Sequence, residues 1–158
     1  MHAPKLEEFP ENLRQRLGCF VTLNIRHRLR GCIGTIVGME PLVTCAWKMA
    51  QASAFNDHRF PRLTAAEWPN VSVEITVLDK LSPCPGADSI EIGKHGLVLQ
   101  FAGRTGVFLP QVPVEQHWDV PAYLSNLCRK AGVPDGSWKD PKARLFWYQG
   151  FKFTAREV

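Results

Sequence analysis

The sequence predicts an α+β protein in which two subdomains of antiparallel sheet each carry helices on one side. Short runs rich in β-branched and aromatic residues occur in pairs across tight turns, and such hairpins build antiparallel sheets. Each pair is followed by a run whose apolar residues recur at helical spacing. The order of hairpin, helix, short helix and strand then occurs a second time, which indicates a duplicated hairpin–helix–strand unit.

The first subdomain is expected over residues 18–80, after a polar arm at 1–17. Its opening hairpin combines a strand at 19–25 with a returning strand at 29–36, because both runs are rich in residues that favour strands. The basic turn Arg26-His27-Arg28 joins the two strands.

A helix and a second strand complete the first subdomain. The helix spans 41–55, where Pro41 suits the first helical position. Residues 64–67 read Thr-Ala-Ala-Glu, a capping box that predicts a short helix ended by Pro69. Apolar and polar residues then alternate over 71–77, as in a strand with one buried face.

The second subdomain is expected over 81–143, beyond the Pro- and Gly-rich break that starts at Ser82. It repeats the hairpin, with strands at 96–102 and 105–109, and the helix, at 120–131. The chain then closes with a strand. An alternative organisation adds this closing strand, taken as 144–154, to the first subdomain.

Composition and cysteine content limit the function classes. Of 158 residues, 45% are hydrophobic and 22% are charged, which excludes disordered and fibrous classes. A formal charge of +4 permits an anionic partner without indicating a nucleic-acid binder. Five cysteines, with no Cys-x-x-Cys pair, favour reduced thiols in the cytoplasm. The sequence shows no secretory signal, membrane-spanning run, phosphate loop or zinc motif, so neither membrane, cofactor nor metal is expected.

Cys32 is the first candidate for chemistry. Strand alternation predicts that Arg28, Arg30 and Cys32 project to one face, with Leu29 and Ile33 on the other. A guanidinium this close favours the thiolate, so Cys32 could be a reactive thiol in a basic niche. The alternative is a small core residue between closely packed strands, which is common for unpaired cysteine.

The polar run Asn56-Asp57-His58-Arg59 lies between two phenylalanines at the end of the predicted helix. These side chains could bind an anionic or amide-bearing ligand, and Asp57 and His58 could complete a triad with Cys32. The alternative is a helix-end cap in which Asp57 forms a salt bridge with Arg59. For any one of these residues, the structural explanation is the simpler one.

Glu74 and the basic turn are weaker candidates. Glu74 lies on the polar face of an otherwise apolar strand, and it would pair with Arg30 if the two faces meet. The basic cluster around residues 26–30 lacks interleaved aromatic residues for stacking on bases. A solvated hairpin tip is therefore preferred there to a nucleic-acid site.

Several strings of residues together resemble one known family. The specific string is Arg30-Gly31-Cys32-Ile33-Gly34-Thr35, preceded by Phe-Val-Thr-Leu from residue 20. Further similar segments follow in order, and they lie at 54–64, 74–78, 96–99, 106–112 and 127–138. This pattern resembles the AMMECR domain family, the AMME syndrome candidate protein group, from about residue 18 to residue 153.

The resemblance implies two subdomains built from a duplicated unit, with the last strand exchanged between the halves. It brings no established reaction. It implies association with Memo-like proteins and radical-SAM proteins, as one component of a shared system. Members of the family usually carry an additional N-terminal helix, and residues 1–17 or a second subunit could cover the surface that this helix would occupy.

These observations give two hypotheses for one cleft. The leading hypothesis is an accessory module that presents the cleft to a small ligand or to a protein partner. The alternative is a thiol-dependent enzyme with Cys32 as nucleophile, Arg30 stabilising negative charge, and Asp57 or Glu74 orienting groups or moving protons. The residues expected to bind the ligand are Gly31, Gly34, Thr35, Asn56 and Arg59.

Overall fold

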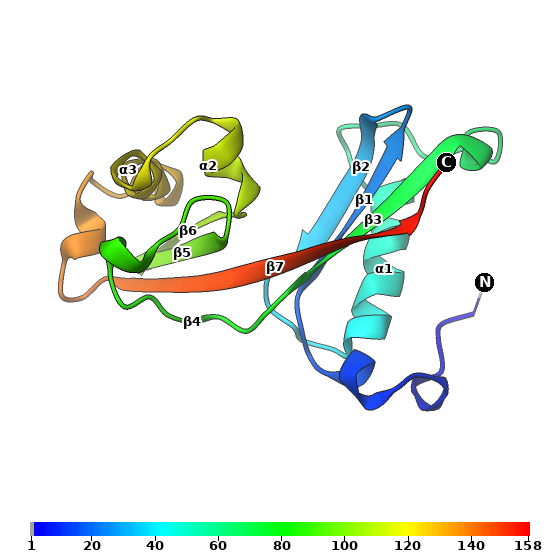
Figure 1. The fold of residues 1–158 in the computed structure, drawn as a ribbon, viewed down its shortest axis with the longest axis horizontal. Coiled ribbons are helices and arrows are strands. Elements are labelled where there is room, and N and C mark those ends of the chain that lie inside the picture. The colour runs from blue at the N-terminus through cyan, green and yellow to red at the C-terminus, as the bar shows by residue number, and fades with distance from the viewer. Residues whose placement is uncertain (1) are drawn as a thin grey trace. The chain divides into compact units, whose positions relative to one another are not determined.

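The computed structural model describes residues 2–158, and these form two compact units. Unit 1 contains the described residues up to Lys80 together with Phe151–Val158, and unit 2 contains Leu81–Gly150. Both units combine antiparallel strands with a packed helix, so the predicted α+β class is confirmed (Figure 1).

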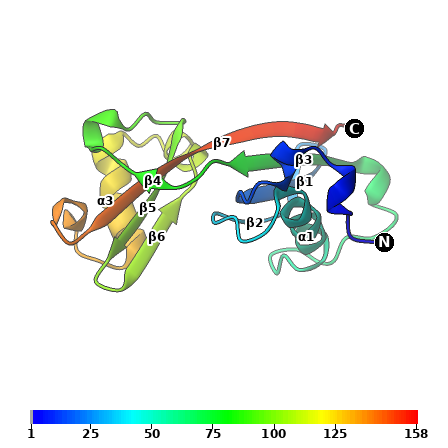
Figure 2. The same cartoon turned by 90° about the horizontal axis from the view of Figure 1, so that it is seen from below.

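Unit 1 is a sheet covered on one face by a single long helix. Its strands lie in the order β2-β1-β3-β7, where the last position is taken by the C-terminal part of β7. The bounds are β1 (Cys19–Ile25), β2 (Arg28–Thr35), α1 (Leu42–Phe55), β3 (Val71–Leu78) and β7 (Arg144–Arg156). Helix α1 contacts β1 and β2, as Figure 2 also shows.

The face of the unit 1 sheet that α1 covers is apolar. Val21 and Leu23 of β1 and Val71 of β3 are almost fully buried there, packed with the Met and Ala side chains of α1. Because side chains alternate along a strand, the residues between them point to the opposite face. The buried Ser53 of α1 bridges the strands, since its hydroxyl accepts from Ile33 N at 2.8 Å and donates to Val21 O at 2.7 Å.

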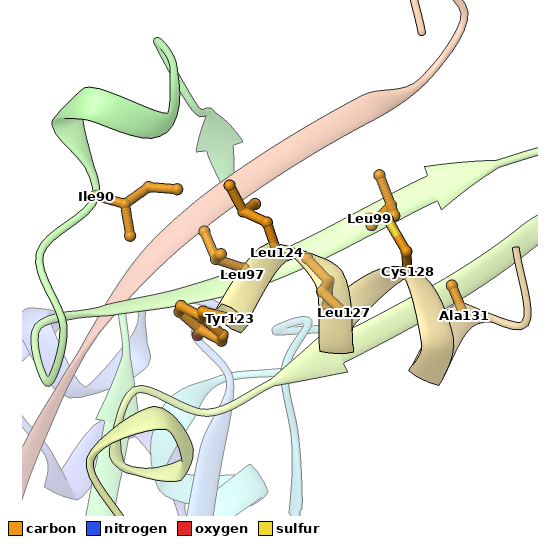
Figure 3. Close-up of a cluster of buried hydrophobic side chains, with 8 residues drawn as sticks. All are labelled: Ile90, Leu97, Leu99, Tyr123, Leu124, Leu127, Cys128 and Ala131. Atoms are coloured by element: carbon orange, nitrogen blue, oxygen red, sulfur yellow. The ribbon is translucent and has the colours of Figure 1, made fainter. Parts of the chain in front are cut away.

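Unit 2 repeats this construction with shorter elements. The elements are β4 (Ser82–Pro83), β5 (His95–Phe101), β6 (Arg104–Phe108), α2 (Gln111–Glu115) and α3 (Val120–Ala131), with the first part of β7. Asp119 caps α3 by accepting a hydrogen bond from Ala122 N, and Gly132 ends the helix in the left-handed region. The apolar stripe of α3 packs on the inner side chains of β5 (Figure 3).

The residues before β1 and after α1 differ from the sequence predictions in detail. The predicted arm contains two 3-10 turns, Leu6–Glu8 and Glu11–Arg14, and Leu13 packs against the core beside α1. The hydrogen bonds of the Thr64 capping box form, but they close a turn that leads into a 3-10 helix at Trp68–Asn70.

No helix among residues 2–158 is both long enough and apolar enough to cross a membrane.

Candidate functional site

A β-bulge at Arg30 decides where Cys32 points. The turn pairs Asn24 with Leu29, but the next pair is Leu23 with Gly31, so Arg30 has no partner in β1. The extra residue shifts the alternation of everything that follows it. Cys32 therefore shares a face with Leu29 and lies on the opposite face from Arg28. The prediction that Arg28, Arg30 and Cys32 share a face is wrong for this reason.

Cys32 belongs to a polar row on the face of the unit 1 sheet opposite α1. Thr22 is the cross-strand partner of both Cys32 and Glu74, which places the three residues side by side. The Thr22 hydroxyl lies 3.2 Å from the Cys32 sulfur. Asn24 donates a hydrogen bond to Glu74 at 3.3 Å, and Lys152 of β7 approaches Glu74 at 3.5 Å. We call these five residues the polar row.

The polar row is partly accessible and only loosely bonded. Cys32 is a free thiol of intermediate exposure, and the Glu74 side chain is 28% exposed. The two contacts to Glu74 are both longer than an optimal charged hydrogen bond of about 2.7–2.9 Å. The carboxylate of Glu74 can therefore accept a further donor from a ligand without losing a strong internal bond.

Asp57 and Arg59 bind the outer edge of β2. Cys32 N donates to Asp57 Oδ2 at 2.9 Å, and Arg59 Nη2 donates to Cys32 O at 3.2 Å. The two side chains also pair directly, with Arg59 Nη2 2.7 Å from Asp57 Oδ2. Hydrogen bonds from the Arg59 side chain, together with those from Cys32 N and Arg59 N, hold the pKa of Asp57 well below its usual range although burial opposes the shift. The predicted salt bridge between Asp57 and Arg59 is therefore present, but the Asp57 carboxylate bonds to the edge of β2 and does not cap α1, whose C-cap is Asn56.

The Cys32–His58–Asp57 triad is not assembled. Both carboxylate oxygens of Asp57 accept hydrogen bonds from Arg59 or from Cys32 N, and the His58 side chain is exposed. The contact between Asp57 and Cys32 runs through the backbone N–H, so it does not activate the sulfur.

Arg30 is held by a different carboxylate from the one predicted. Its Nε donates to Glu67 Oε1 at 2.8 Å and its Nη2 donates to Glu67 Oε2 at 3.2 Å. Glu67 also accepts from Thr64 N, which closes the capping box. The Arg30 guanidinium, followed by these bonds from Thr64, lowers the pKa of Glu67 to about 2. The pairing of Arg30 with Glu74, expected if their faces met, does not form, because the bulge takes Arg30 out of the row.

The glycines and small polar residues around Cys32 have structural roles. A Cβ on Gly31 would overlap the backbone oxygen of Ser53, and a Cβ on Gly34 would overlap the Phe20 ring. The Thr35 hydroxyl donates to Val37 O at 3.1 Å. Asn56 is the exposed C-cap of α1. The two glycines thus accommodate close packing of α1 and β1, whereas the sequence analysis placed them among the residues expected to bind the ligand.

The residues expected to line one cleft divide into three groups. Asp57 and Arg59 lie at the β2 edge, Arg30 pairs with Glu67, and Glu74 joins Cys32 in the polar row. Sequence reasoning did not identify Thr22, Asn24, Lys152 or Ser53. The hairpin pattern contained a signal for Thr22, because a residue in the middle of β1 must lie opposite some residue of β2. The bulge that places Cys32 opposite Thr22 cannot be recognised from the pattern of hydrophobic residues.

The fold and the polar row define a two-unit α+β protein with a thiol and a carboxylate on one sheet face. The family model described as AMMECR1 matches residues 1–153. The chain therefore belongs to the AMMECR1 family, as its motifs indicated.

Relatives and a solved structure extend this comparison. A protein of Methanocella arvoryzae is 39% identical over 157 residues, which cover 95% of this chain and 79% of the relative. Protein MJ0810 of Methanocaldococcus jannaschii is 36% identical over 160 residues, with 96% and 80% covered. The crystal structure of the uncharacterized protein PH0010 from Pyrococcus horikoshii superposes with a TM-score of 0.81 at 35% identity, over 98% of this chain and 80% of that one.

Proposed function

We propose that this protein is an accessory binding module and that the polar row is its binding surface. The observation that carries the proposal is the contrast between the two faces of the unit 1 sheet. One face is apolar and covered by α1, whereas the other presents Cys32, Thr22 and Glu74 side by side with partial exposure. Partly buried polar groups with weak internal partners are suited to recognition, because a ligand can replace those partners.

The chemistry of the row favours a partner that donates hydrogen bonds or carries positive charge. Glu74 is the one carboxylate in the row, and both its hydrogen bond from Asn24 and its ion pair with Lys152 are long. A basic or amide-rich segment of a protein partner could bond to Glu74 and to the Thr22 hydroxyl together. The resemblance to the AMMECR domain family makes a Memo-like or a radical-SAM protein the partner class to test first.

Isothermal titration calorimetry tests the proposal. The protein is titrated with a purified Memo-like protein and, in a separate experiment, with a radical-SAM protein. Glu74→Gln should weaken the complex by about tenfold or more, the size expected for losing a charge-assisted bond. Glu91→Gln is the matched control, because Glu91 is an exposed glutamate paired with Lys94 at 2.9 Å in unit 2. Equal affinity of both variants, or no binding of either partner by the wild type, would contradict the proposal.

A thiol-dependent reaction at Cys32 is the second candidate. The partly exposed sulfur and the hydroxyl at 3.2 Å favour it. Its assistants would have to come from the row, because Arg30 and Asp57 are bonded elsewhere. In a substrate screen, turnover lost in Cys32→Ser and kept in Cys84→Ser would establish the enzyme.

We further propose a reducing compartment such as the cytoplasm, because all five cysteines are free.

A further inference from the structure

Two buried cysteines meet where the first strand packs on the long helix. Cys19 of β1 and Cys45 of α1 are 0% and 1% exposed, and their sulfur atoms lie 3.2 Å apart. Cys19 donates the hydrogen bond and the Cys45 sulfur accepts it. Both are free thiols, and they form a small core cluster with Leu42. This pair lies on the face of the sheet opposite the polar row, so it has no part in the proposed binding surface.

We propose that Cys19 and Cys45 are a redox modification site, which hydrogen peroxide converts to a disulfide joining β1 to α1. The two sulfur atoms are already in contact before reaction. A disulfide bond is about 2.05 Å long, so the two sulfurs need to approach by only about 1 Å. The two side chains already point at one another, since their thiols are hydrogen-bonded.

The surroundings of Cys45 make it the sulfur that reacts first. Cys45 is in the opening turn of α1, and its N–H bonds to Pro41 O at 2.9 Å. The positive end of the helix dipole there favours a thiolate. The hydrogen bond from Cys19 acts in the same direction and lowers the pKa of the Cys45 thiol, while it raises that of Cys19.

The reaction balances with hydrogen peroxide as the only oxidant. The Cys45 thiolate attacks one peroxide oxygen, the O–O bond breaks, and the products are a sulfenic acid and hydroxide, which takes up the proton that Cys45 lost. The Cys19 sulfur then attacks the sulfenic sulfur. The S–S bond forms, the S–O bond breaks, and the leaving oxygen takes the Cys19 proton to become water. Two thiols are oxidised, and one peroxide is reduced to two waters.

Burial selects the oxidant. Leu13 and Leu17, from the segment before β1, pack against the cluster that contains the two sulfurs. Hydrogen peroxide is close to water in size and can reach such a site during small local openings of the fold. Oxidised glutathione is a much larger molecule and requires a larger opening. Peroxide should therefore oxidise the folded protein faster than oxidised glutathione does at equal concentration.

Peptide mapping of the oxidised protein tests the proposal. The Cys32→Ser variant, which prevents linkage between molecules through that partly exposed thiol, is treated with hydrogen peroxide, quenched with catalase, unfolded and alkylated. Digestion without reductant should give a linked Cys19–Cys45 peptide pair that is two hydrogens lighter than the separate peptides. Cys84 and Cys128 should stay alkylated, and dithiothreitol should reverse the linkage.

The linkage also has a physical signature. It closes a loop between residues 26 positions apart, so Tm of the oxidised protein should rise by roughly 5–10 °C. The same treatment of Cys45→Ala should give no rise. Oxidised methionines show that the peroxide has acted on the sample. If Cys19 and Cys45 are both fully alkylated in such a sample, and so stayed reduced, the proposal is overturned. Sulfinic acid on Cys45 without any linked peptide would overturn it as well. The mapping uses folded Cys32→Ser protein, so it does not depend on whether Cys45→Ala folds.

Discussion

Replacing Asp57 with alanine should destabilise the protein strongly. Its side chain is 3% exposed and accepts hydrogen bonds from Cys32 N, Arg59 N and the Arg59 guanidinium. Alanine leaves the Cys32 N–H at the sheet edge without its acceptor. It also leaves Arg59 without its partner carboxylate.

The size of the loss follows from these contacts. A hydrogen bond from a backbone N–H to a charged acceptor contributes about 1.5–3 kcal/mol. The Arg59 side chain is 58% exposed, so its ion pair adds less than about 1 kcal/mol. The total is about 2–4 kcal/mol, which corresponds to a fall in Tm of roughly 5–15 °C for a chain of this length. Asp57→Asn keeps one acceptor oxygen and should cost about half as much.

Thermal melts at neutral pH, and urea unfolding at several pH values, measure this effect. The pKa of Asp57 is depressed in the folded state, so the ionised carboxylate stabilises the protein above its unfolded pKa of about 3.9 and loses this effect as pH falls. The gap between wild type and Asp57→Asn should therefore be constant near neutral pH and shrink below about pH 4. A Tm of Asp57→Ala within about 2 °C of wild type, or a gap that does not change with pH, would refute the reasoning.

Three further predictions use the same structure. Glu67→Gln should lower the free energy of unfolding at pH 7, and in urea titrations its value should approach that of wild type as pH falls toward 2, because the pKa of Glu67 is about 2 beside Arg30. Gly31→Ala should lower Tm strongly, because its Cβ overlaps Ser53 O, whereas Gly86→Ala, with open space around its Cβ, should leave Tm nearly unchanged in thermal melts. Cys32 should react with iodoacetamide in the folded protein faster than the buried Cys128, as followed by mass spectrometry. Labelling of Cys32 only after unfolding would contradict the partial exposure of its thiol.

The elements of the fold were predictable because each carries a strong local signal. The alternation from Val71 to Val77 and the stop of α3 at Gly132 act within a few residues. The short helix α2 was missed, since Gln111–Glu115 contains a proline and too few residues for a periodic pattern. The turn after Thr64 kept its hydrogen bonds but not its helix, because Pro69 lies directly beyond it.

The candidate site was harder to predict because one unpaired residue sets its geometry. Without the bulge at Arg30, a two-residue turn would place Cys32 opposite Val21, on the face that α1 covers. The bulge reverses that placement and sends Arg30 to Glu67. Only the packing of β2 against Ser53 and the contacts at the β2 edge, which join residues 20 or more positions apart, could indicate the bulge.

The bonds from Asp57 and Arg59 to Cys32 also bear on solubility. β2 is the outermost strand on its side of the sheet, and an unprotected outer strand offers free N–H and C=O groups to strands of other molecules. Here one carboxylate and one guanidinium occupy the N–H and C=O of Cys32, in the way that a neighbouring strand would. Variants that lose these side chains should therefore aggregate through this edge, at protein concentrations where the wild type stays dispersed.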